Sequence, residues 1–126
     1  KPMTETTRDR LVWVEIPATD LDRAKTFYEA VLKADLIENN DGPQTMHMIP
    51  SANGAMCGHL YAGKPATQGD GITAHLAVQG ELPDAMDRVR AGGGEVVSET
   101  IALPSGAFFY AKDTEGNSLG IFRYSD

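Results

Sequence analysis

LVWVEIPATDLDRAKTFYEAVL, residues 11–32, holds the pattern from which the rest of the chain can be interpreted. Residues 11–16 are rich in β-branched and aromatic side chains, which predicts a strand, and Pro17 is expected to end it. Thr19 or Asp20 can cap a helix, because a short side-chain oxygen accepts from an unpaired amide one turn later. Apolar residues then recur at helical spacing, at Leu21, Ala24, Phe27, Tyr28, Val31 and Leu32. The stretch therefore predicts a strand, a tight loop and a helix that lays its apolar face on a sheet.

The same pattern returns about 60 residues later, close to half the chain length, as an internal repeat would. Residues 71–78 are typical of a strand, and residues 82–91 of a helix with Pro83 in the first turn, where its missing N–H costs nothing. The glycines at 92–94 can supply a left-handed cap. Two unrelated strand–helix units are the alternative. The strands that follow each helix also pair off, however, and this favours a repeat.

Three further strands are predicted after each helix. In the first half they are residues 34–38, 44–49 and 55–61, separated by turns rich in Asn, Asp, Gly and Pro. In the second half they are residues 95–100, 107–112 and 118–124. Residues 62–70 lack periodicity and are typical of a linker. The chain is therefore predicted to be an α+β protein of two βαβββ modules, residues 11–62 and 71–126.

Composition limits the class of protein. A chain of 126 residues is one ordinary domain, and half of it is too small to bury a good core alone, so we expect the two modules to form a single domain. The formal net charge of -7 argues against nucleic acid and anionic membrane surfaces as partners. No segment is apolar enough to span a bilayer, and no signal peptide is recognised. Cys57 is the only cysteine, which excludes an intrachain disulfide and fits the cytoplasmic location that we expect.

Three motifs resemble those of a known superfamily. They are the first module's entry at residues 16–28 (IPATDLDRAKTFY), the glycines in residues 90–94 (RAGGG), and residues 109–117 (FYAKDTEGN), where Thr114 replaces the proline of an Asp-Pro-Glu-Gly-Asn turn. On these motifs the chain resembles the vicinal oxygen chelate superfamily, which includes glyoxalase I, bleomycin-resistance protein, methylmalonyl-CoA epimerase and extradiol dioxygenases. The resemblance implies two modules about a pseudo-two-fold axis, with curved mixed sheets that enclose a cavity. It also implies a homodimer, because a second chain often completes that cavity.

The resemblance implies a divalent metal as well. Its ligands would be His or Glu side chains on the first and last strands of both modules. These positions fall on Trp13, Gly58, Thr73 and Gly120. Trp and Gly side chains have no atom that can ligate a metal, and Thr is a poor ligand. A shift of the alignment by one residue would place only His59 at a ligand position. We therefore expect no metal and no cofactor. A divalent metal displaced onto Glu15, His59 and His75 is the alternative.

A ligand pocket is predicted where the metal would lie. Side chains two apart share one face of a strand, so Trp13 lies with Glu15, and Thr73 with His75. The repeat would bring both faces into the central cavity, where Glu15 and His75 would meet and could orient a ligand or act as acid and base. An apolar pocket with a few polar groups is the usual form of a small-molecule site. The residues expected to line it are Trp13, Glu15, Thr73, His75, Tyr110, Gly120 and Phe122, with Phe108 as an alternative to Tyr110.

These residues also have structural interpretations. Trp13 can belong to the core, where large aromatic side chains contribute much of the burial. Glu15 can lie on a wetted sheet face, and His75 can be a hydrogen-bonded structural histidine. The other two histidines, His47 and His59, are expected at the surface or the rim of the pocket.

Three functions are consistent with these features. The favoured one is a metal-free binding protein of the bleomycin-resistance type that holds a small aromatic or amphipathic molecule. The second is a lyase, epimerase or dioxygenase with a displaced metal, which would use His75, Glu15 and His59. The third is an interaction module with a vestigial pocket. Metal titration separates the second from the others, and a thermal shift caused by ligand without metal separates the first from the third.

Overall fold

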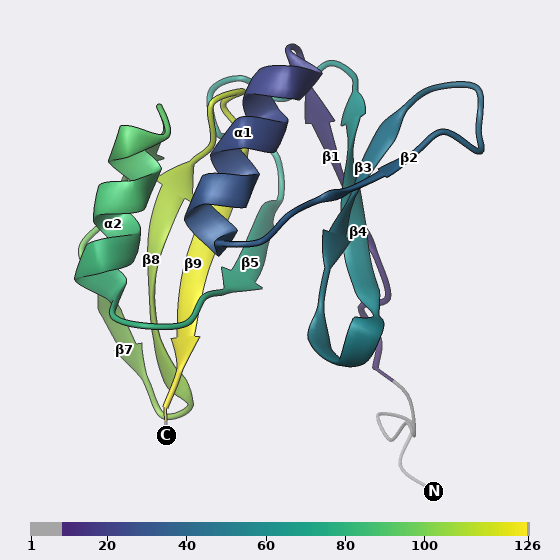
Figure 1. The fold of residues 1–126 in the computed structure, drawn as a ribbon. Helices are drawn as coiled ribbons and strands as arrows, with labels where there is room; N and C mark the ends of the chain where they lie inside the picture. Colours follow the sequence, from purple (N-terminus) through teal and green to yellow (C-terminus); the bar gives the residue numbers. More distant parts are fainter. Residues whose placement is uncertain (1–8, 126) are drawn as a thin grey trace, which may run out of the picture.

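A computed structural model describes residues 9–125, which form two mixed β-sheets and two α-helices (Figure 1). The first sheet has the order β1-β4-β3-β2, and β1 (Val14–Ala18) runs parallel to β4 (Met56–Ala62). β3 (Met46–Pro50) is antiparallel to both β4 and β2 (Ile37–Asn39). Helix α1 (Leu21–Leu32) connects β1 to β2, and a short 3-10 turn, η1 (Ala52–Gly54), precedes β4. This half is a βαβββ unit, as predicted.

The second sheet repeats the arrangement. Its order is β5-β9-β8-β6, and β5 (Thr73–Ala77) runs parallel to β9 (Ser118–Tyr124) as β1 does to β4. Helix α2 (Leu82–Ala91) connects β5 to β6 (Glu95–Val96). Both β6 and β7 (Ile101–Leu103) pair with β8 (Gly106–Lys112). The predicted α+β fold of two related modules is confirmed.

Both helices have the bounds that the sequence predicted. Asp20 is the N-cap of α1, and its side chain accepts a hydrogen bond from the Arg23 amide at 3.1 Å. Pro83 lies in the first turn of α2, as expected. The chain leaves α2 through Gly93, whose φ of +92° is the left-handed conformation that glycine adopts without strain. Neither helix in the described part of the chain is long and apolar enough to cross a membrane.

The first strand differs from the prediction. β1 begins at Val14 rather than Leu11, and it continues through Pro17 instead of ending before it. β1 is an edge strand, where an outward-facing N–H has no partner, so that proline is tolerated. Alternation along β1 is kept, because Ile16 is buried and Glu15 is exposed.

The strand predicted at residues 95–100 is confirmed only over β6, at Glu95–Val96, and β7 is a further strand that the sequence did not predict. The amides of Val97 and Ser98 both donate to the Tyr110 carbonyl, at 2.8 and 3.3 Å. Ser98 Oγ in turn accepts from the Tyr110 amide at 2.9 Å. Two residues thus oppose one, which is a β-bulge, and the pairing with β8 is interrupted there.

One hydrophobic core joins the two modules. α1 packs against α2 and β4, and α2 packs against β6, β8 and β9, so that the helices cover one face of each sheet (Figure 1). The largest fully buried side chains come from both modules: Tyr28, Phe27, Phe109, Ile49, Leu60, Leu119, Ile121, Val31 and Val89. The opposite sheet faces, which carry Glu15 and His75, have no helix over them in residues 9–125.

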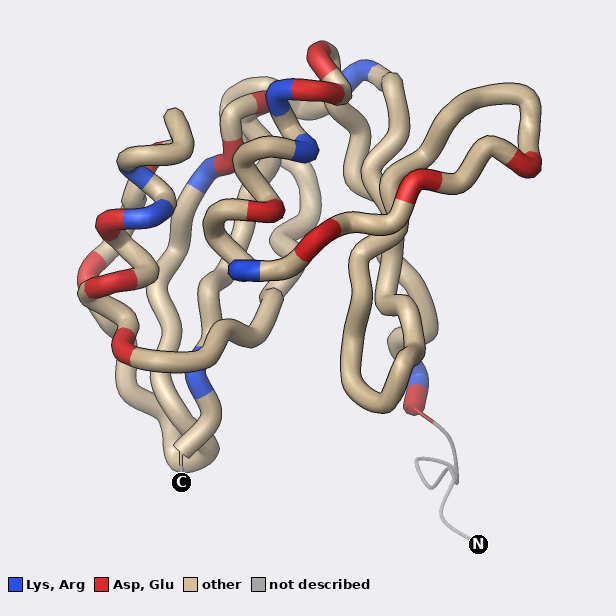
Figure 2. The backbone as a smooth tube through the Cα atoms, viewed as in Figure 1, with Lys and Arg blue, Asp and Glu red and all other residues tan. Residues whose placement is uncertain are grey.

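The turn at residues 113–117, between β8 and β9, connects the second module to the start of α1. We call this contact the junction. Glu115 accepts from the Asp20 amide at 2.8 Å and from Nε and Nη2 of Arg23 at 2.8 and 2.9 Å. Acidic and basic residues gather at this end of α1 (Figure 2). The hydrogen bonds from Arg23 hold the pKa of Glu115 at about 2, below its ordinary value of 4.5.

A buried tyrosine completes the junction. The Tyr28 hydroxyl donates to Asp113 Oδ2 at 2.6 Å, and burial together with this carboxylate raises the pKa of Tyr28 well above its ordinary value. Asp113 Oδ1 accepts from the amides of Glu115 and Asn117, both at 2.8 Å. The Asn117 side chain donates to the Pro17 carbonyl at 2.8 Å. The FYAKDTEGN motif therefore holds the two modules together.

Candidate functional site

Three of the candidate residues form a cluster on the helix-free face of the first sheet. Glu15 of β1 pairs directly with His59 of β4, which brings their side chains together. Nε1 of Trp13 donates to Nδ1 of His59 at 2.9 Å, and Nε2 of His59 lies 3.3 Å from Oε1 of Glu15. The ring of Tyr61, two residues further along β4, has its centre 5.9 Å from that of His59. Trp13, His59 and Glu15 are called the Trp13 cluster below.

The hydrogen bond from Trp13 fixes the tautomer of the neutral His59 ring. Indole nitrogen is a donor only, so Nδ1 of His59 accepts and the ring hydrogen of the neutral form is on Nε2, directed at Glu15. Nδ1 therefore has a hydrogen-bond partner, and Nε2 is within ion-pair range of Glu15. The His59 side chain is only 10% exposed, whereas that of Glu15 is 67% exposed. The free acceptor that the cluster offers to a ligand is the Glu15 carboxylate, beside the partly exposed face of Trp13.

A second, aromatic cluster lies on the helix-free face of the second sheet. The His75 ring is 5.0 Å from that of Phe108 and 6.0 Å from that of Tyr110, and both contacts are edge-on. Gly120 pairs with His75, and a Cβ built on Gly120 would be 2.1 Å from Nδ1 of His75. Glycine leaves room at this position for the imidazole, which lies across it. Phe122 continues the aromatic face and contacts Tyr124 with ring centres 4.8 Å apart.

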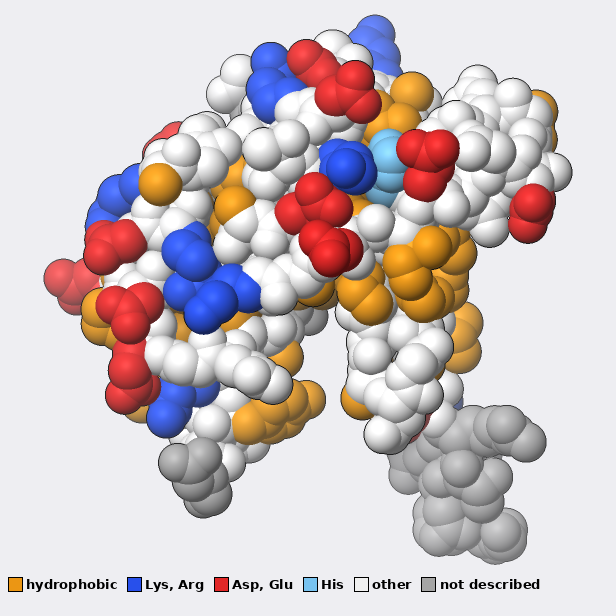
Figure 3. Space-filling model, viewed as in Figure 1, with side chains coloured by type: hydrophobic (Ala, Val, Ile, Leu, Met, Phe, Trp, Pro, Cys, Tyr) orange, Lys and Arg blue, Asp and Glu red, His pale blue; other side chains and the backbone are white. Residues whose placement is uncertain are grey.

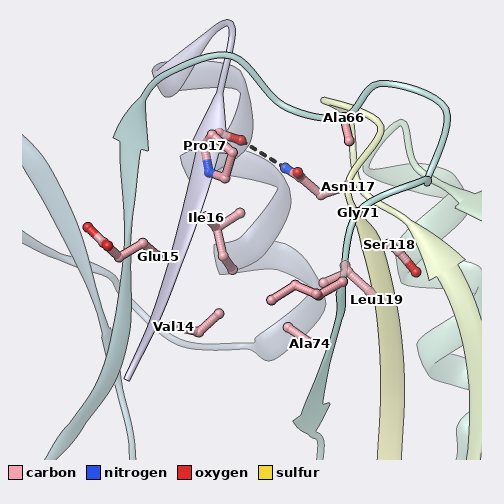
Figure 4. A pocket seen from close by; sticks show the side chains of 11 residues that line it. Val14, Glu15, Ile16, Pro17, Ala66, Gly71, Ala74, Asn117, Ser118 and Leu119 are labelled. Atoms are coloured by element: carbon pink, nitrogen blue, oxygen red, sulfur yellow. Dashed lines mark hydrogen bonds between the residues drawn. The ribbon is translucent and has the colours of Figure 1, made fainter. Parts of the chain in front are cut away.

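The predicted meeting of Glu15 with His75 does not occur within one chain. Glu15 pairs with His59, and His75 packs against aromatic rings of its own sheet. The groove between β1 and β5 is instead lined largely by apolar side chains, and Glu15, although it borders the groove, points away from them (Figure 4). Its apolar members are Val14, Ile16, Ala74 and Leu119. The prediction failed because each strand shows its core face to that groove and its site face to the other side.

The pairing of β4 corrects a second expectation. His59, and not Gly58, is the residue beside Glu15, just as Gly120 is the residue beside His75 in the second module. Gly58 faces the opposite way, and a Cβ built on it would be 2.3 Å from a carbonyl oxygen of β1. The last-strand ligand position implied for the first module therefore falls on His59.

The residues at the implied metal positions do not fit a divalent ion. In the corrected register they are Trp13, His59, Thr73 and Gly120. Nδ1 of His59 has a hydrogen-bond partner, and its Nε2 is within ion-pair range of Glu15. The Thr73 hydroxyl is 2.6 Å from that of Ser118. Throughout residues 9–125, no three His, Cys, Asp or Glu side chains are grouped so as to hold a metal ion. The alternative set of Glu15, His59 and His75 is divided between two sheets.

Sequence reasoning missed some neighbours of these clusters. Tyr61 could have been found, because it follows His59 by two residues and so shares its face. Ser118 could not, because its contact with Thr73 depends on the register of strands 45 residues apart. His47 and His59 were expected at the surface or rim, but they are only 3% and 8% exposed.

A family model matches residues 10–121 of this chain, and its description is the Glyoxalase/Bleomycin resistance protein/Dioxygenase superfamily. No curated protein sequence matches the chain. Solved structures resemble it at low sequence identity. A hypothetical protein from S. aureus has a TM-score of 0.71 at 19% identity, with 92% of this chain and 95% of that chain covered.

Two further structures have informative descriptions. A glyoxalase/bleomycin resistance protein from Albidiferax ferrireducens T118 has a TM-score of 0.63 at 20% identity, covering 93% of this chain and 100% of that one. The fosfomycin resistance protein FosX from Listeria monocytogenes has a TM-score of 0.69 at 16% identity, covering 95% and 94%. At these identities the likeness concerns the fold alone.

Proposed function

The chain belongs to the glyoxalase/bleomycin resistance protein/dioxygenase superfamily, and from this premise we propose that it binds a small aromatic or amphipathic molecule without a resident metal ion. The observation that carries the proposal is the Trp13 cluster. In it, a tryptophan, a histidine and a carboxylate are held in fixed orientation on a sheet face that no helix covers within residues 9–125. Side chains held in this way bind with little loss of conformational entropy.

Each residue of the Trp13 cluster has a different role in the proposed binding. The Trp13 ring supplies a flat apolar surface, and 36% of that residue is exposed. The Glu15 carboxylate supplies an acceptor for an N–H or O–H of the ligand. His59 lies between them, because its Nδ1 accepts a hydrogen bond from Trp13 and its Nε2 is 3.3 Å from Oε1 of Glu15.

The aromatic face around His75 is the second half of the proposed site. It lies on the other sheet, so we propose a homodimer in which the His75 face of one copy covers the Trp13 cluster of the other. Two features support this arrangement. β1 and β5 are edge strands, and the apolar residues before them, Leu11, Val12 and Ile72, are 82%, 78% and 88% exposed. Exposed apolar groups near an open sheet edge are typical of an interface.

The intrinsic fluorescence of the protein tests the binding proposal, because Trp13 is the only tryptophan. Bleomycin and fosfomycin are the first probes, since the family description and a structural neighbour name them. We expect saturable quenching or a spectral shift of Trp13 in the presence of EDTA. Glu15→Gln and His75→Ala are expected to weaken binding about tenfold, the effect of losing one hydrogen bond to a charged group or one aromatic contact.

Glu99→Gln is the matched control for Glu15→Gln, because Glu99 is an exposed carboxylate distant from Trp13 in the chain. Its binding should equal that of the parent. Elemental analysis of the purified protein should find no stoichiometric divalent ion. A protein that binds its ligand only after Zn, Mn, Ni or Fe is added, or unaltered affinity in both site variants, would contradict the proposal.

A further inference from the structure

A larger cavity lies between the two modules, on the core side of the first sheet. Its volume is about 710 Å³, within the range of small-molecule sites. The C-terminal end of α1 borders it at residues 32–34, and the walls are residues 49–52 with Cys57 on one side and residues 76–79 with Tyr124 on the other. A hollow between the two arms of the molecule is visible in this region (Figure 3).

The charges that border this cavity are all positive. Lys33 and Arg88 line it, and none of its lining residues is Asp or Glu. A patch of basic side chains lies between α2 and the C-terminal end of α1 (Figure 3). The protein as a whole has a net charge of -7, so this positive patch is a local exception. A cavity with walls of one charge favours ligands of the opposite charge.

Arg88 lines this cavity, and one nitrogen of its guanidinium has no hydrogen-bond partner among the described residues. Its Nε donates to the Val31 carbonyl at 3.2 Å, one of the carbonyls at the end of α1 that have no partner in the helix. Its Nη2 is buried and has no hydrogen-bond partner among the described residues. A guanidinium that lines a mostly apolar cavity favours a carboxylate or sulfonate there, because such charge-assisted hydrogen bonds are stronger than neutral ones.

The remaining wall is mostly apolar. It consists of Leu32, Ala34, Ile49, Pro50, Ala52, Leu76, Ala77 and Val78. Cys57 also lines the cavity because the pairing of β3 with β4 shifts there: Ile49 pairs with Gly58 and Pro50 with Met56. Cys57 is therefore the extra residue of a bulge, and it packs against the core.

We propose that this cavity binds a small organic anion with an apolar body and one carboxylate or sulfonate head group, which Arg88 contacts. The site is separate from the Trp13 cluster, because the two lie on opposite faces of the first sheet. It gives the protein a second ligand class, amphipathic anions, that does not depend on the function proposed above.

The lone cysteine provides a direct readout of the cavity. Cys57 is the only thiol, and its rate of alkylation by iodoacetamide should fall when the cavity is occupied. The probes are decanoate, below its micelle concentration, and 1-decanol, which has the same apolar body without the charge. We expect decanoate to protect Cys57 at a concentration about tenfold lower than 1-decanol, the effect of one charged hydrogen bond.

Variants of α2 separate charge from apolar contact. Arg88→Met keeps an unbranched apolar side chain, and it should weaken decanoate protection about tenfold while 1-decanol protection is unchanged. Arg88→Lys keeps the charge and should retain most of the difference between the probes. Arg90→Met is the matched control, because Arg90 is exposed, pairs with Asp87 and does not line the cavity. Thermal unfolding by circular dichroism verifies that each variant is folded.

Several outcomes would overturn the proposal. They are equal protection by both probes, absence of protection, and an Arg88→Met variant that binds decanoate like the parent. Protection that rises with protein concentration in the absence of any probe would show that a second copy covers the cavity instead. Trp13 fluorescence emission, recorded in the same titration, distinguishes binding at the Trp13 cluster from binding in the cavity. A response of Trp13 without protection of Cys57 would assign the anion to the Trp13 cluster and would refute only the cavity site.

Discussion

Glu115 is a buried carboxylate, and its hydrogen-bond donors come from the N-terminal end of α1 and from its own turn. Its donors are the Asp20 amide, the Arg23 guanidinium and the Thr114 hydroxyl, which lies 2.7 Å away. Glu115 is 5% exposed, whereas the Arg23 side chain is 52% exposed. Solvent therefore screens part of the attraction between Arg23 and Glu115. The Asp20 amide contributes a larger share of the stabilisation of Glu115 than it would beside a fully buried ion pair.

The junction predicts a loss of stability in acid. The pKa of Glu115 is about 2 in the folded state and 4.5 ordinarily, so the folded state favours the charged form. Its contribution is complete above pH 4.5 and is lost as the pH falls toward 2. After allowance for screening, we expect about 1–2 kcal/mol to disappear over this range. Urea unfolding between pH 2 and 7 measures this loss.

Glu115→Gln should flatten that acid limb and lower the free energy of unfolding at pH 7 by about 1–3 kcal/mol. Glu99→Gln, at an exposed carboxylate, is the matched control and should behave as the parent does. An acid limb in Glu115→Gln as steep as that of the parent would assign the pH dependence to other carboxylates.

Tyr28 gives a second test at the scale of one residue. Tyr28→Phe removes the hydroxyl that donates to Asp113 at 2.6 Å and leaves the aromatic packing intact. Because a hydrogen bond to a buried charged group is stronger than average, we expect a loss of about 1.5–3 kcal/mol in the free energy of unfolding. Tyr124→Phe, at a residue that is 68% exposed, should change it by less than about 0.5 kcal/mol. A similar, small effect in both variants would show that the Tyr28 hydroxyl is energetically neutral.

At the scale of elements, helices were predictable from sequence and strand limits were not. Local signals define α1 and α2: Asp20 caps one, and Pro83 opens the other. β1 has no such signal, and its limits follow from which residues find a partner in β4, 44 residues later along the chain at Val14 and Gly58. The bulge at residues 97–100 is likewise a property of the pairing with β8 and has no clear local signature.

Gly58 and Gly120 both lie in strands, but they differ in how well the surrounding structure can accommodate an added Cβ. A Cβ at Gly58 would be 2.3 Å from the backbone oxygen of Val14, whereas a Cβ at Gly120 would meet only the His75 ring. Backbone in a paired sheet cannot move away, but a side chain can change rotamer. We expect Gly58→Ala to lower the free energy of unfolding by about 2–3 kcal/mol and Gly120→Ala by less than about 1 kcal/mol.

Chemical denaturation of the two alanine variants makes the comparison. Gly120→Ala should also shift the imidazole NMR signals of His75, because the ring has to leave its place against β9. Equal destabilisation by the two substitutions would contradict the claim that the backbone beside Gly58 is less able to move than the His75 side chain beside Gly120.

For the whole molecule, alternation predicted which residues share a face but not which faces meet. Trp13 and Glu15 do lie together, as expected from their spacing. The partner of Glu15 is His59 and not His75, because β1 and β5 turn their core faces to the groove between them and their site faces away from it. Which faces meet depends on how the two modules pack together, and no local pattern in the sequence specifies that packing.

The proposed dimer is a prediction at the same scale. Leu11, Val12 and Ile72 are each more than three-quarters exposed, at 82%, 78% and 88%, and they lie beside the open edges of β1 and β5. We expect a dimer in sedimentation equilibrium at micromolar concentration, and a monomer for the double variant Val12→Glu with Ile72→Glu. Val97→Glu, at a residue that is 50% exposed on the bulge, should remain dimeric. A parent protein that sediments as a monomer refutes the dimer.

The junction also has a consequence for the order of events during synthesis. The amide that begins α1 belongs to Asp20, and the carboxylate that accepts from it belongs to Glu115, 95 residues later. At a translation rate of ~5–20 residues per second, the ribosome needs roughly 5–20 s to add those residues. The N-terminus of α1 therefore stays exposed to water, without its acceptor Glu115, until almost all of the described chain has been synthesised. We expect released chains truncated before Glu115 to be cleaved readily by protease near α1, and chains that include it to resist.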